Sequence, residues 1–559
     1  MEPPPRPPRN VMEAGGGLGI TSIGEDILQI ILSKLPALSF ASAACVSSTW
    51  HRLCALILSR PKLLSALSLN PRLEIAVKET LDKVLSQPIR PHFAIACVGR
   101  KFSLKKTHQL VRAKLGSRIP IVVSAAGGII GSDALTNEFE EVKWEEDDSG
   151  ENQMHNSPAN VNRGIVLIVG FMPGLKVNAI PLLRSREEPP QEAMMNKFVM
   201  DIKDYTASIS GCSSPTGILM FADQNSDMKP VLHKMDYALS EETVIVGDES
   251  GCFLYSSGDD SLTSGGSQGY FSCKNTKQPS YGNYNCDAVA LVFARDRGKP
   301  HAGLGEIQFH LALSTGVSPV GPTYKGASVR VNKGKESACS TWLTARREGF
   351  VEKFDGQRIL HDIDDEMGNG IFCDDLYIGV VKRRKCSIGS EKGRLVSSLA
   401  FHEVLGGDEE YLYVKGNGIK TGDPFRFYHP DPKVALTSRN NVFEDFRILK
   451  QDLYCKGCHH VRGTAEAGER KLVFGGLVFS CYGRGESFFG CPKVDSLAFL
   501  EDFPGIPLAG MFCGGEIGRG FASSAMQYDS EERSTPSCCL HVYSTVYLVM
   551  LYTSKSPEC

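Results

Sequence analysis

The chain has 559 residues, 42% of them hydrophobic, and a formal net charge of −3, which is the composition of an ordinary globular protein. A chain of this length is too long for one hydrophobic core and indicates about three domains. The nearly neutral charge excludes a protein-wide basic field of the kind that attracts nucleic acid or an anionic membrane.

The first residues and the cysteines bear on where the protein works. Residues 1–19 are rich in proline and glycine, so we expect a disordered leader, and they lack the apolar region of a signal peptide. The 18 cysteines are spread through a large chain and often sit in apolar segments. A protein with ample cores does not need disulfides, so we expect a reducing compartment, the cytoplasm, the nucleus or both.

Residues 20–62 predict three short helices. The first has glutamate and aspartate in its first turn, ends at Pro36, and carries apolar residues every three or four positions: Ile23, Ile27, Leu28, Ile31, Leu32 and Leu35. A second apolar stretch follows at 37–46. Ser47 or Ser48 can then cap a third helix that carries Trp50 and Leu53.

Three such helices have too small a core to be stable alone, and the apolar stripe of the first is wider than one helix needs. Either the helices pack on the rest of the chain or their surplus apolar surface binds another protein. The stretches "IGEDIL" (23–28), "ILSKLP" (31–36) and "VSSTWHRL" (46–53) resemble the F-box family. Gly24 and His51 depart from the usual proline and arginine of that family.

The F-box resemblance implies binding to the SKP1-type adaptor of a cullin-based ubiquitin ligase. By this resemblance the adaptor contacts would be Ile23, Ile27, Leu28, Ile31, Leu32, Leu35, Pro36, Val46, Trp50 and Leu53. Many F-box proteins continue into leucine-rich repeats, but here the leucine spacing at 64–73 occurs once, and a solenoid needs at least three units. We therefore expect a linker helix at 63–90 and no leucine-rich solenoid.

The body of the chain alternates apolar strands and helices. We expect strands at 93–99, 119–128, 164–174, 217–223 and 287–296, and helices at 103–116 and 194–210. Residues 138–162 and 257–285 have the composition of mobile insertions, and from about residue 305 the pattern is richer in strands. The most apolar run, 538–552, predicts a buried strand because it is too short to be a membrane helix.

One sequence pattern occurs twice in the body. Residues 97–131 read "CVGR…IPIVVSAAGGIIG" and residues 481–518 read "CYGR…IPLAGMFCGGEIG". In each copy a strand ends in Cys-x-Gly-Arg, a helix follows, and a second strand ends in Gly-Gly-x-Ile-Gly. Because matched glycines and prolines fix backbone geometry, we predict two related β-α-β units.

The paired glycine loops are candidate ligand sites. After a strand, glycines let the backbone turn tightly and present N–H groups to a carboxylate or another small anion. The alternative is that they only make tight turns. Neither loop has the pattern of a nucleotide-binding motif. The candidate residues are Gly127, Gly128, Gly131, Gly514, Gly515, Glu516 and Gly518.

The same stretches, with "LVFSCYGRGESFFG" (477–490), resemble the FIST domain in its N- and C-terminal parts. This resemblance implies a two-part α/β body, divided here at 91–300 and 301–555, that senses small ligands such as amino acids. An F-box followed by a FIST body resembles F-box-only proteins, which recruit substrates for ubiquitination and proteasomal degradation.

Three other features of the sequence could indicate a metal site, a catalytic residue or a targeting signal. Cys455, Cys458 and His459 have the spacing of half a zinc site, but no second pair follows at suitable spacing, so no metal is predicted. Cys481 or Cys513 could act as a nucleophile beside Glu516, but cysteines after apolar strands are usually buried and inert. The basic run at 382–385 is better explained as a solvated strand end than as a nuclear signal.

We therefore predict a multidomain protein with a small all-α F-box and a two-part α/β body. It would be a non-catalytic, substrate-recruiting subunit of an SCF-type ubiquitin ligase, with no cofactor, nucleic acid or membrane partner. Its partners would be an SKP1-type adaptor with its cullin ligase, an unknown protein substrate and a small ligand. The alternative is a small-ligand sensor whose N-terminal helices bind a different protein.

Overall fold

The structure is a computed structural model, and it describes thirteen segments of the chain. These are residues 24–144, 162–185, 191–223, 226–249, 251–258, 270–271, 284–298, 305–333, 339–368, 375–386, 394–455, 470–521 and 537–554. The leader predicted at 1–19 and most of the two predicted insertions lie outside these segments.

The chain forms two compact units. The first, the helical unit, comprises Met1–Ser59 and Leu85–Ile89, and the second, the body, comprises Arg60–Val84 and Arg90–Cys559. Among the described residues, no helix combines the length and apolar character needed to cross a membrane.

The helical unit contains the three predicted helices, α1 (Glu25–Ser33), α2 (Ala37–Ala43) and α3 (Ser48–Ile57). Pro36 lies in the turn between α1 and α2 and is the N-cap of α2. The Ser47 hydroxyl accepts a hydrogen bond from the Trp50 backbone N–H and so caps α3, as predicted. The Ala37 N–H donates to the Leu85 carbonyl at 2.9 Å, which ties residues 85–89 to α2.

The body is built from three repeats of one strand and helix order, where the sequence pattern had indicated two. Repeat 1 contains β1 (Lys62–Ser68), α4 (Leu73–Val84), β2 (Phe93–Val98), α5 (Leu104–Leu115), β3 (Ile121–Ala125), β4 (Gly128–Ser132), β5 (Phe139–Lys143) and β6 (Ile165–Phe171). The stretch predicted as a linker helix at 63–90 is thus partly strand, because residues 62–68 pair antiparallel with β6 inside a sheet.

Repeats 2 and 3 follow the same order. Repeat 2 contains β7 (Leu175–Ser185), α6 (Gln191–Ser210), β8 (Gly217–Ala222), α7 (Lys229–Ala238), β9 (Val244–Asp248), β10 (Phe253–Ser256), β11 (Tyr270–Phe271) and β12 (Tyr284–Arg295). Repeat 3 contains β13 (Glu306–Ser314), α9 (Pro432–Cys455), β20 (Arg470–Cys481), α10 (Glu486–Phe489), α11 (Val494–Asp502), β21 (Leu508–Cys513), β22 (Glu516–Phe521), β23 (Ser537–His541) and β24 (Thr545–Ser554).

The three repeats also share one pattern of strand pairing. The orders are β1-β6-β2-β3-β10-β11, β7-β12-β8-β9-β22-β23 and β13-β24-β20-β21-β4-β5. In each order the third and fourth strands are parallel neighbours joined through a helix, and the other pairs are antiparallel. The two predicted β-α-β units are confirmed, and β8-α7-β9 is a third.

The repeats exchange hairpins in a cycle. The hairpin β4–β5 leaves repeat 1 and pairs with β21 of repeat 3. The pair β22–β23 leaves repeat 3 and pairs with β9 of repeat 2. The pair β10–β11 leaves repeat 2 and pairs with β3 of repeat 1. No repeat therefore completes its own sheet.

Each exchanged hairpin also makes a polar contact with a helix that lies between the two parallel strands of the repeat that receives it. The Ser256 hydroxyl of β10 lies 2.9 Å from Nε2 of His108 on α5. Arg519 of β22 donates to Asp236 of α7 at 2.7 Å. The Ser496 hydroxyl of α11 donates to Glu141 of β5.

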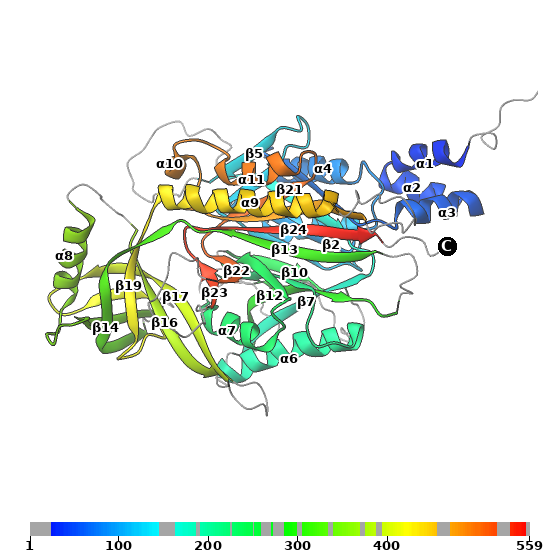
Figure 1. Ribbon diagram of the computed structural model, residues 1–559. Helices are drawn as coiled ribbons and strands as arrows, with labels where there is room; N and C mark the ends of the chain where they lie inside the picture. Colours follow the sequence, from blue (N-terminus) through cyan, green and yellow to red (C-terminus); the bar gives the residue numbers. More distant parts are fainter. Residues whose placement is uncertain are drawn as a thin grey trace, which may run out of the picture. The chain divides into compact units, whose positions relative to one another are not determined.

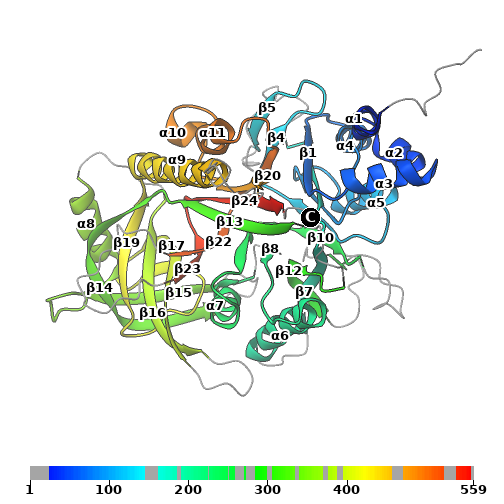
Figure 2. The same ribbon diagram turned by 45° about the vertical axis from the view of Figure 1, so that its right-hand side comes forward.

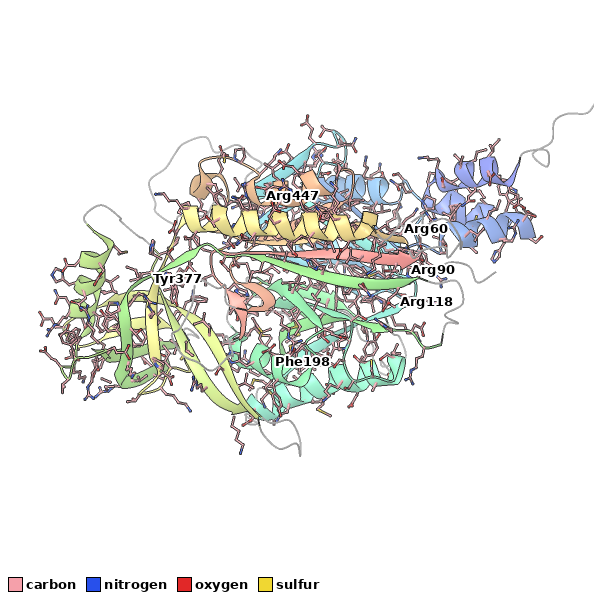
Figure 3. All side chains as sticks on the ribbon, viewed as in Figure 1. Arg60, Arg90, Arg118, Phe198, Tyr377 and Arg447 are labelled. Atoms are coloured by element: carbon pink, nitrogen blue, oxygen red, sulfur yellow. The ribbon has the colours of Figure 1, made fainter. Side chains whose placement is uncertain are left out.

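The sheets of the three repeats share one central core, with helices on their outer faces (Figures 1 and 2). The core takes Ile95 from repeat 1, Leu291 from repeat 2 and Leu548 from repeat 3, each at most 2% exposed. In Figure 1, α9 runs along β13 and β24, while α6 and α7 cover the opposite side. Phe198 of α6, labelled in Figure 3, is buried between α6 and the sheet of repeat 2.

Repeat 3 carries an insertion between β13 and α9. It contains β14 (Val317–Lys333), β15 (Cys339–Arg347), α8 (Gly356–Met367), β16 (Tyr377–Cys386), β17 (Arg394–Gly407), β18 (Leu412–Lys415) and β19 (Pro424–Pro430). Its strands follow the order β16-β19-β14-β15-β18-β17, and β17 also pairs with β16, so they close into an inserted barrel. This region confirms the strand-rich pattern expected from about residue 305.

Two sequence expectations are corrected in detail. The run 538–552 forms two strands, β23 and β24, because the chain turns at Tyr543, whose φ is +48°. The basic run 382–385 lies within β16 and pairs with β17 along its length, rather than following the strand. The charged residues of this run therefore belong to the barrel wall.

Candidate adaptor-docking surface

The helical unit exposes an unusual amount of apolar surface for its size. Apart from Leu56 of α3 (48%), its exposed large apolar side chains are Ile27 (57%), Ile30 (62%), Ile31 (45%), Leu38 (82%) and Val46 (64%). Single exposed apolar residues are normal, but several on a unit of three short helices are typical of a surface that binds another protein. We call these five residues the apolar patch.

Helix α1 has two adjacent apolar stripes. At about 100° per residue, Ile27, Ile30 and Ile31 fall within an arc of about 100°, and they are exposed. Leu28 and Leu32 lie on the neighbouring arc and are 6% and 0% exposed. This accounts for the width of the stripe seen in the sequence, since one part holds the helices together and the other faces solvent.

The residues predicted to contact the adaptor divide into three groups. Ile27, Ile31, Pro36 and Val46 are exposed. Leu35 and Trp50 are half-buried. The fully buried members belong to the core of the helical unit and support the patch from below: Leu28, Leu32 and Leu53. Ile23 lies outside the described residues.

Two members of the patch were missed by the sequence analysis. Ile30 lies three residues after Ile27 and so shares its face, and that spacing was the available signal. Leu38 belongs to the apolar stretch at 37–46, which was recognised without assigning its exposed member. Neither residue can be recognised as exposed until the packing of α1, α2 and α3 is known.

The two departures from the F-box pattern leave the local geometry intact. Gly24 has φ −58° and ψ 149°, which is a backbone conformation that proline also adopts, and its carbonyl accepts from the Leu28 N–H at 3.1 Å. Nδ1 of His51 lies 3.3 Å from the Ala44 carbonyl. An ion pair between Arg52 and Glu25 joins α3 to the start of α1.

The glycine loops lie where the chain crosses from one repeat to another. The Gly127 N–H donates to the Phe512 carbonyl at 3.0 Å, so the loop of repeat 1 contacts β21 of repeat 3. A Cβ at Gly128 would lie 2.4 Å from the Val142 carbonyl oxygen, which is closer than side chains tolerate. The glycine is therefore required by the close approach of β5 within the β4–β5 hairpin.

The loop of repeat 3 makes the corresponding crossing. The Gly515 carbonyl accepts from the Glu249 N–H at 2.9 Å, and Gly518 pairs with Val246 of β9. Gly131 likewise pairs within the β4–β5 hairpin, and Gly514 is exposed. These contacts favour the tight-turn interpretation, and ligand binding by the loops stays a prediction.

Glu516 is fully buried at the start of β22. Its Oε2 accepts from the Ser544 hydroxyl at 2.9 Å, and burial raises the pKa of its carboxyl to about 8. Burial also raises the pKa of the Cys481 and Cys513 thiols well above their usual range. A nucleophilic cysteine needs its thiolate, so this environment argues against either thiol as a nucleophile.

The predicted half zinc site falls mostly outside the described residues. Cys455 is the last residue of α9, and Cys458 and His459 belong to the segment beyond it. Cys491, a cysteine further along the chain, is exposed. Within the described segments, no three histidine, cysteine or acidic side chains are grouped so that they could hold a metal ion.

Comparison with known proteins identifies the family of the N-terminal helices. Residues 20–59 match the family of F-box domains. An F-box/LRR-repeat protein from Arabidopsis thaliana is 42% identical over 548 residues, covering 96% of this chain and 94% of that protein. The name of that relative refers to leucine-rich repeats, but the described residues of this chain form no solenoid.

Proposed function

This chain belongs to the F-box protein family, and from that premise we propose that it recruits a protein substrate to an SCF-type ubiquitin ligase. F-box domains bind the SKP1-type adaptor of such ligases, and F-box proteins generally act as non-catalytic substrate adaptors. The observation that supports docking at a defined place is the apolar patch on α1, α2 and the loop before α3.

In the proposal the apolar patch contacts the adaptor, and the buried leucines beneath it hold its shape. Contact of this kind is driven by the removal of apolar surface from water, which contributes roughly 25 cal/mol of binding free energy per Å² buried. The body then receives the substrate, and ubiquitination followed by proteasomal degradation is the outcome. We place this activity in the cytoplasm, the nucleus or both.

The finer part of the proposal is that the body senses a small ligand, as its resemblance to FIST domains implies. The glycine loops are the proposed site, although several of their backbone groups are bonded within the fold. Thermal unfolding with a panel of amino acids and small anions tests this, because a ligand that binds only the folded state raises the melting temperature. If no compound changes the melting temperature, substrate recruitment to the ligase remains the only proposed function.

The adaptor proposal is tested by co-purification with an SKP1-type adaptor. The full chain should elute with the adaptor as a stoichiometric complex from a sizing column. The variant Ile27→Asp with Ile31→Asp should weaken binding by at least about tenfold, because two exposed apolar contacts are replaced by charges that must be desolvated.

The chain offers a matched control for this variant. Ile448 of α9 and Val331 of β14 are 58% and 46% exposed, close to the values for Ile27 and Ile31. The variant Ile448→Asp with Val331→Asp should bind the adaptor as the parent chain does. Equal binding by all three proteins would refute the proposed surface, and no binding by the parent chain would refute the ligase role.

A further inference from the structure

Helix α5 and its two flanking turns carry a concentration of positive charge. Residues 100–118 contain seven lysine and arginine residues and no aspartate or glutamate. Six of the basic residues are exposed and define what we call the α5 basic surface: Arg100, Lys101, Lys105, Lys106, Lys114 and Arg118. Arg118 is labelled in Figure 3.

The fold does not require this charge, as the equivalent helices of the other repeats show. Helix α7 carries Lys229, Lys234 and Asp236. Helix α11 contains no basic residue and three acidic ones. All three helices join parallel strands in the same way, so the positive charge of α5 is a property of repeat 1 alone.

The two copies of Cys-x-Gly-Arg show the same contrast. In repeat 3, Arg484 is fully buried and forms a double hydrogen bond with Asp495, at 2.8 and 2.6 Å. In repeat 1 the equivalent Arg100 is exposed. The same four-residue pattern therefore stabilises the interior in one repeat and adds to a charged surface in the other.

Four of these six basic residues have no ion pair within the described part of the chain. Lys106 pairs with Glu74 of α4. Arg100, Lys105, Lys114 and Arg118 form no ion pair with a described residue. Like charges on one helix repel each other, so the four residues without an ion pair have a cost in stability that a negatively charged partner would relieve.

The chemistry of the surface limits its partner. Phe102 is buried, so the segment offers no exposed aromatic ring on which a nucleic acid base could stack. The exposed neighbours Ser103, Gln109 and Ala113 are polar or small, and the leucines of the helix are at least partly buried, so the segment exposes no large apolar side chain fully enough to insert deeply into a lipid bilayer. What remains is a group of exposed cations, which pair with carboxylates.

We propose that the α5 basic surface binds an acidic segment of a partner protein, rich in aspartate and glutamate. Calling this partner the substrate rests on the proposed ligase function, but the binding itself does not. Electrostatic complementarity of this kind sets partner choice and association rate, and salt weakens it.

The test measures the binding of a fluorescent peptide of ten glutamates, flanked by glycine and serine, to the full chain without the adaptor. Binding is followed by fluorescence anisotropy at low and physiological salt. The variant with Arg100, Lys105, Lys114 and Arg118 each changed to Glu should bind at least about tenfold more weakly, and salt should weaken binding by the parent chain.

A control variant makes the same change in net charge elsewhere, with exposed Arg346, Lys353, Arg383 and Lys433 each changed to Glu. It should bind within about twofold of the parent. Equal losses of peptide binding in both variants, or no loss in the first, would refute the α5 basic surface as the binding site. Tighter binding to a thymidine oligonucleotide of equal charge would overturn the assignment to protein. Co-elution with the adaptor, expected of both variants, keeps this test separate from that of the ligase role.

Discussion

At the scale of single residues, the junction between repeats 2 and 3 contains two glutamates whose pKa values are raised by burial. Glu516 of β22 is the register partner of Asp248 on β9 and of His541 on β23. Cys481 and Ser544 also face its carboxyl. Burial raises the pKa of Glu516 to about 8 and that of the neighbouring Glu249 to about 7.

The raised pKa of Glu516 gives stability a definite dependence on pH. Between the unfolded value of 4.5 and the folded value of about 8, the folded chain holds a proton that the unfolded chain has released. The free energy of unfolding therefore falls as pH rises through this range. This is the reverse of the usual acidic side chain, whose pairing with a cation stabilises the fold at neutral pH.

We predict that Glu516→Gln flattens this dependence. The amide is neutral at every pH, and its oxygen can still accept the hydrogen bond from Ser544. The variant should be more stable than the parent at pH 9, by on the order of a few kcal/mol, and closer to it at pH 5. Urea unfolding at pH 5 and pH 9 measures the free energy of unfolding of both proteins. The variant should keep a weak dependence on pH, because Glu249 still titrates. A loss of stability that is equal at both pH values would contradict the prediction.

At the scale of elements, exchanged hairpins and helix ends stabilise each other. Helix α7 of repeat 2 ends without a basic residue in its last turn. Arg519, from β22 of repeat 3, supplies the missing donors. Its guanidinium donates to the Asp236 carboxylate and carbonyl and to the Leu239 and Thr243 carbonyls, at 2.7 to 3.1 Å. A side chain from another repeat thus satisfies the free carbonyls of a helix end.

We predict that Arg519→Ala lowers the free energy of unfolding by roughly 3 kcal/mol, because it leaves a largely buried Asp236 and several carbonyls without their partner. Arg519→Lys should recover only part of this, since an ammonium cannot reach all of these acceptors.

Arg447 of α9, which pairs with Glu444 at the surface, is the control for this prediction (Figure 3). Arg447→Ala should cost less than about 0.5 kcal/mol, as exposed ion pairs usually do. Urea unfolding compares the three variants with the parent. Similar small losses for Arg519→Ala and Arg447→Ala would show that the contact at the end of α7 does not stabilise the body.

At the scale of the whole molecule, the cyclic exchange of hairpins makes the three repeats depend on each other. The predicted division at residue 300 falls between repeats 2 and 3. A cut there removes β21 from β4 and β22 from β9, so strand edges are left unpaired on both sides. Unpaired edges and exposed apolar faces promote aggregation rather than folding.

We predict that a fragment ending at residue 300 does not fold as a monomer. It should lack a cooperative urea transition and precipitate or bind a hydrophobic dye, while the full chain unfolds cooperatively. Adding a fragment of residues 301–559 during refolding should restore soluble, folded protein, because it supplies β21 and β22. A soluble monomeric fragment with a sharp transition would instead support two independent halves.

The sequence by itself determined the local elements of this protein. Helical spacing and the proline after α1 predicted the front helices, and short apolar runs predicted β2, β6, β8 and β12. It also identified the F-box, because that family is defined by apolar residues at short, fixed spacings. These properties depend on neighbours within a few positions along the chain, so they can be read without knowing the fold.

Only the tertiary structure decided which apolar residues are free to bind. Ile27 and Leu28 are adjacent and equally apolar, yet one is 57% exposed and the other 6%. Arg100 and Arg484 share a motif but differ in burial. The third repeat and the exchange of hairpins could not be predicted from the sequence either. Strand partners such as β4 and β21 lie hundreds of residues apart along the chain. Pairing and burial arise from contacts across the whole chain, which local pattern does not encode.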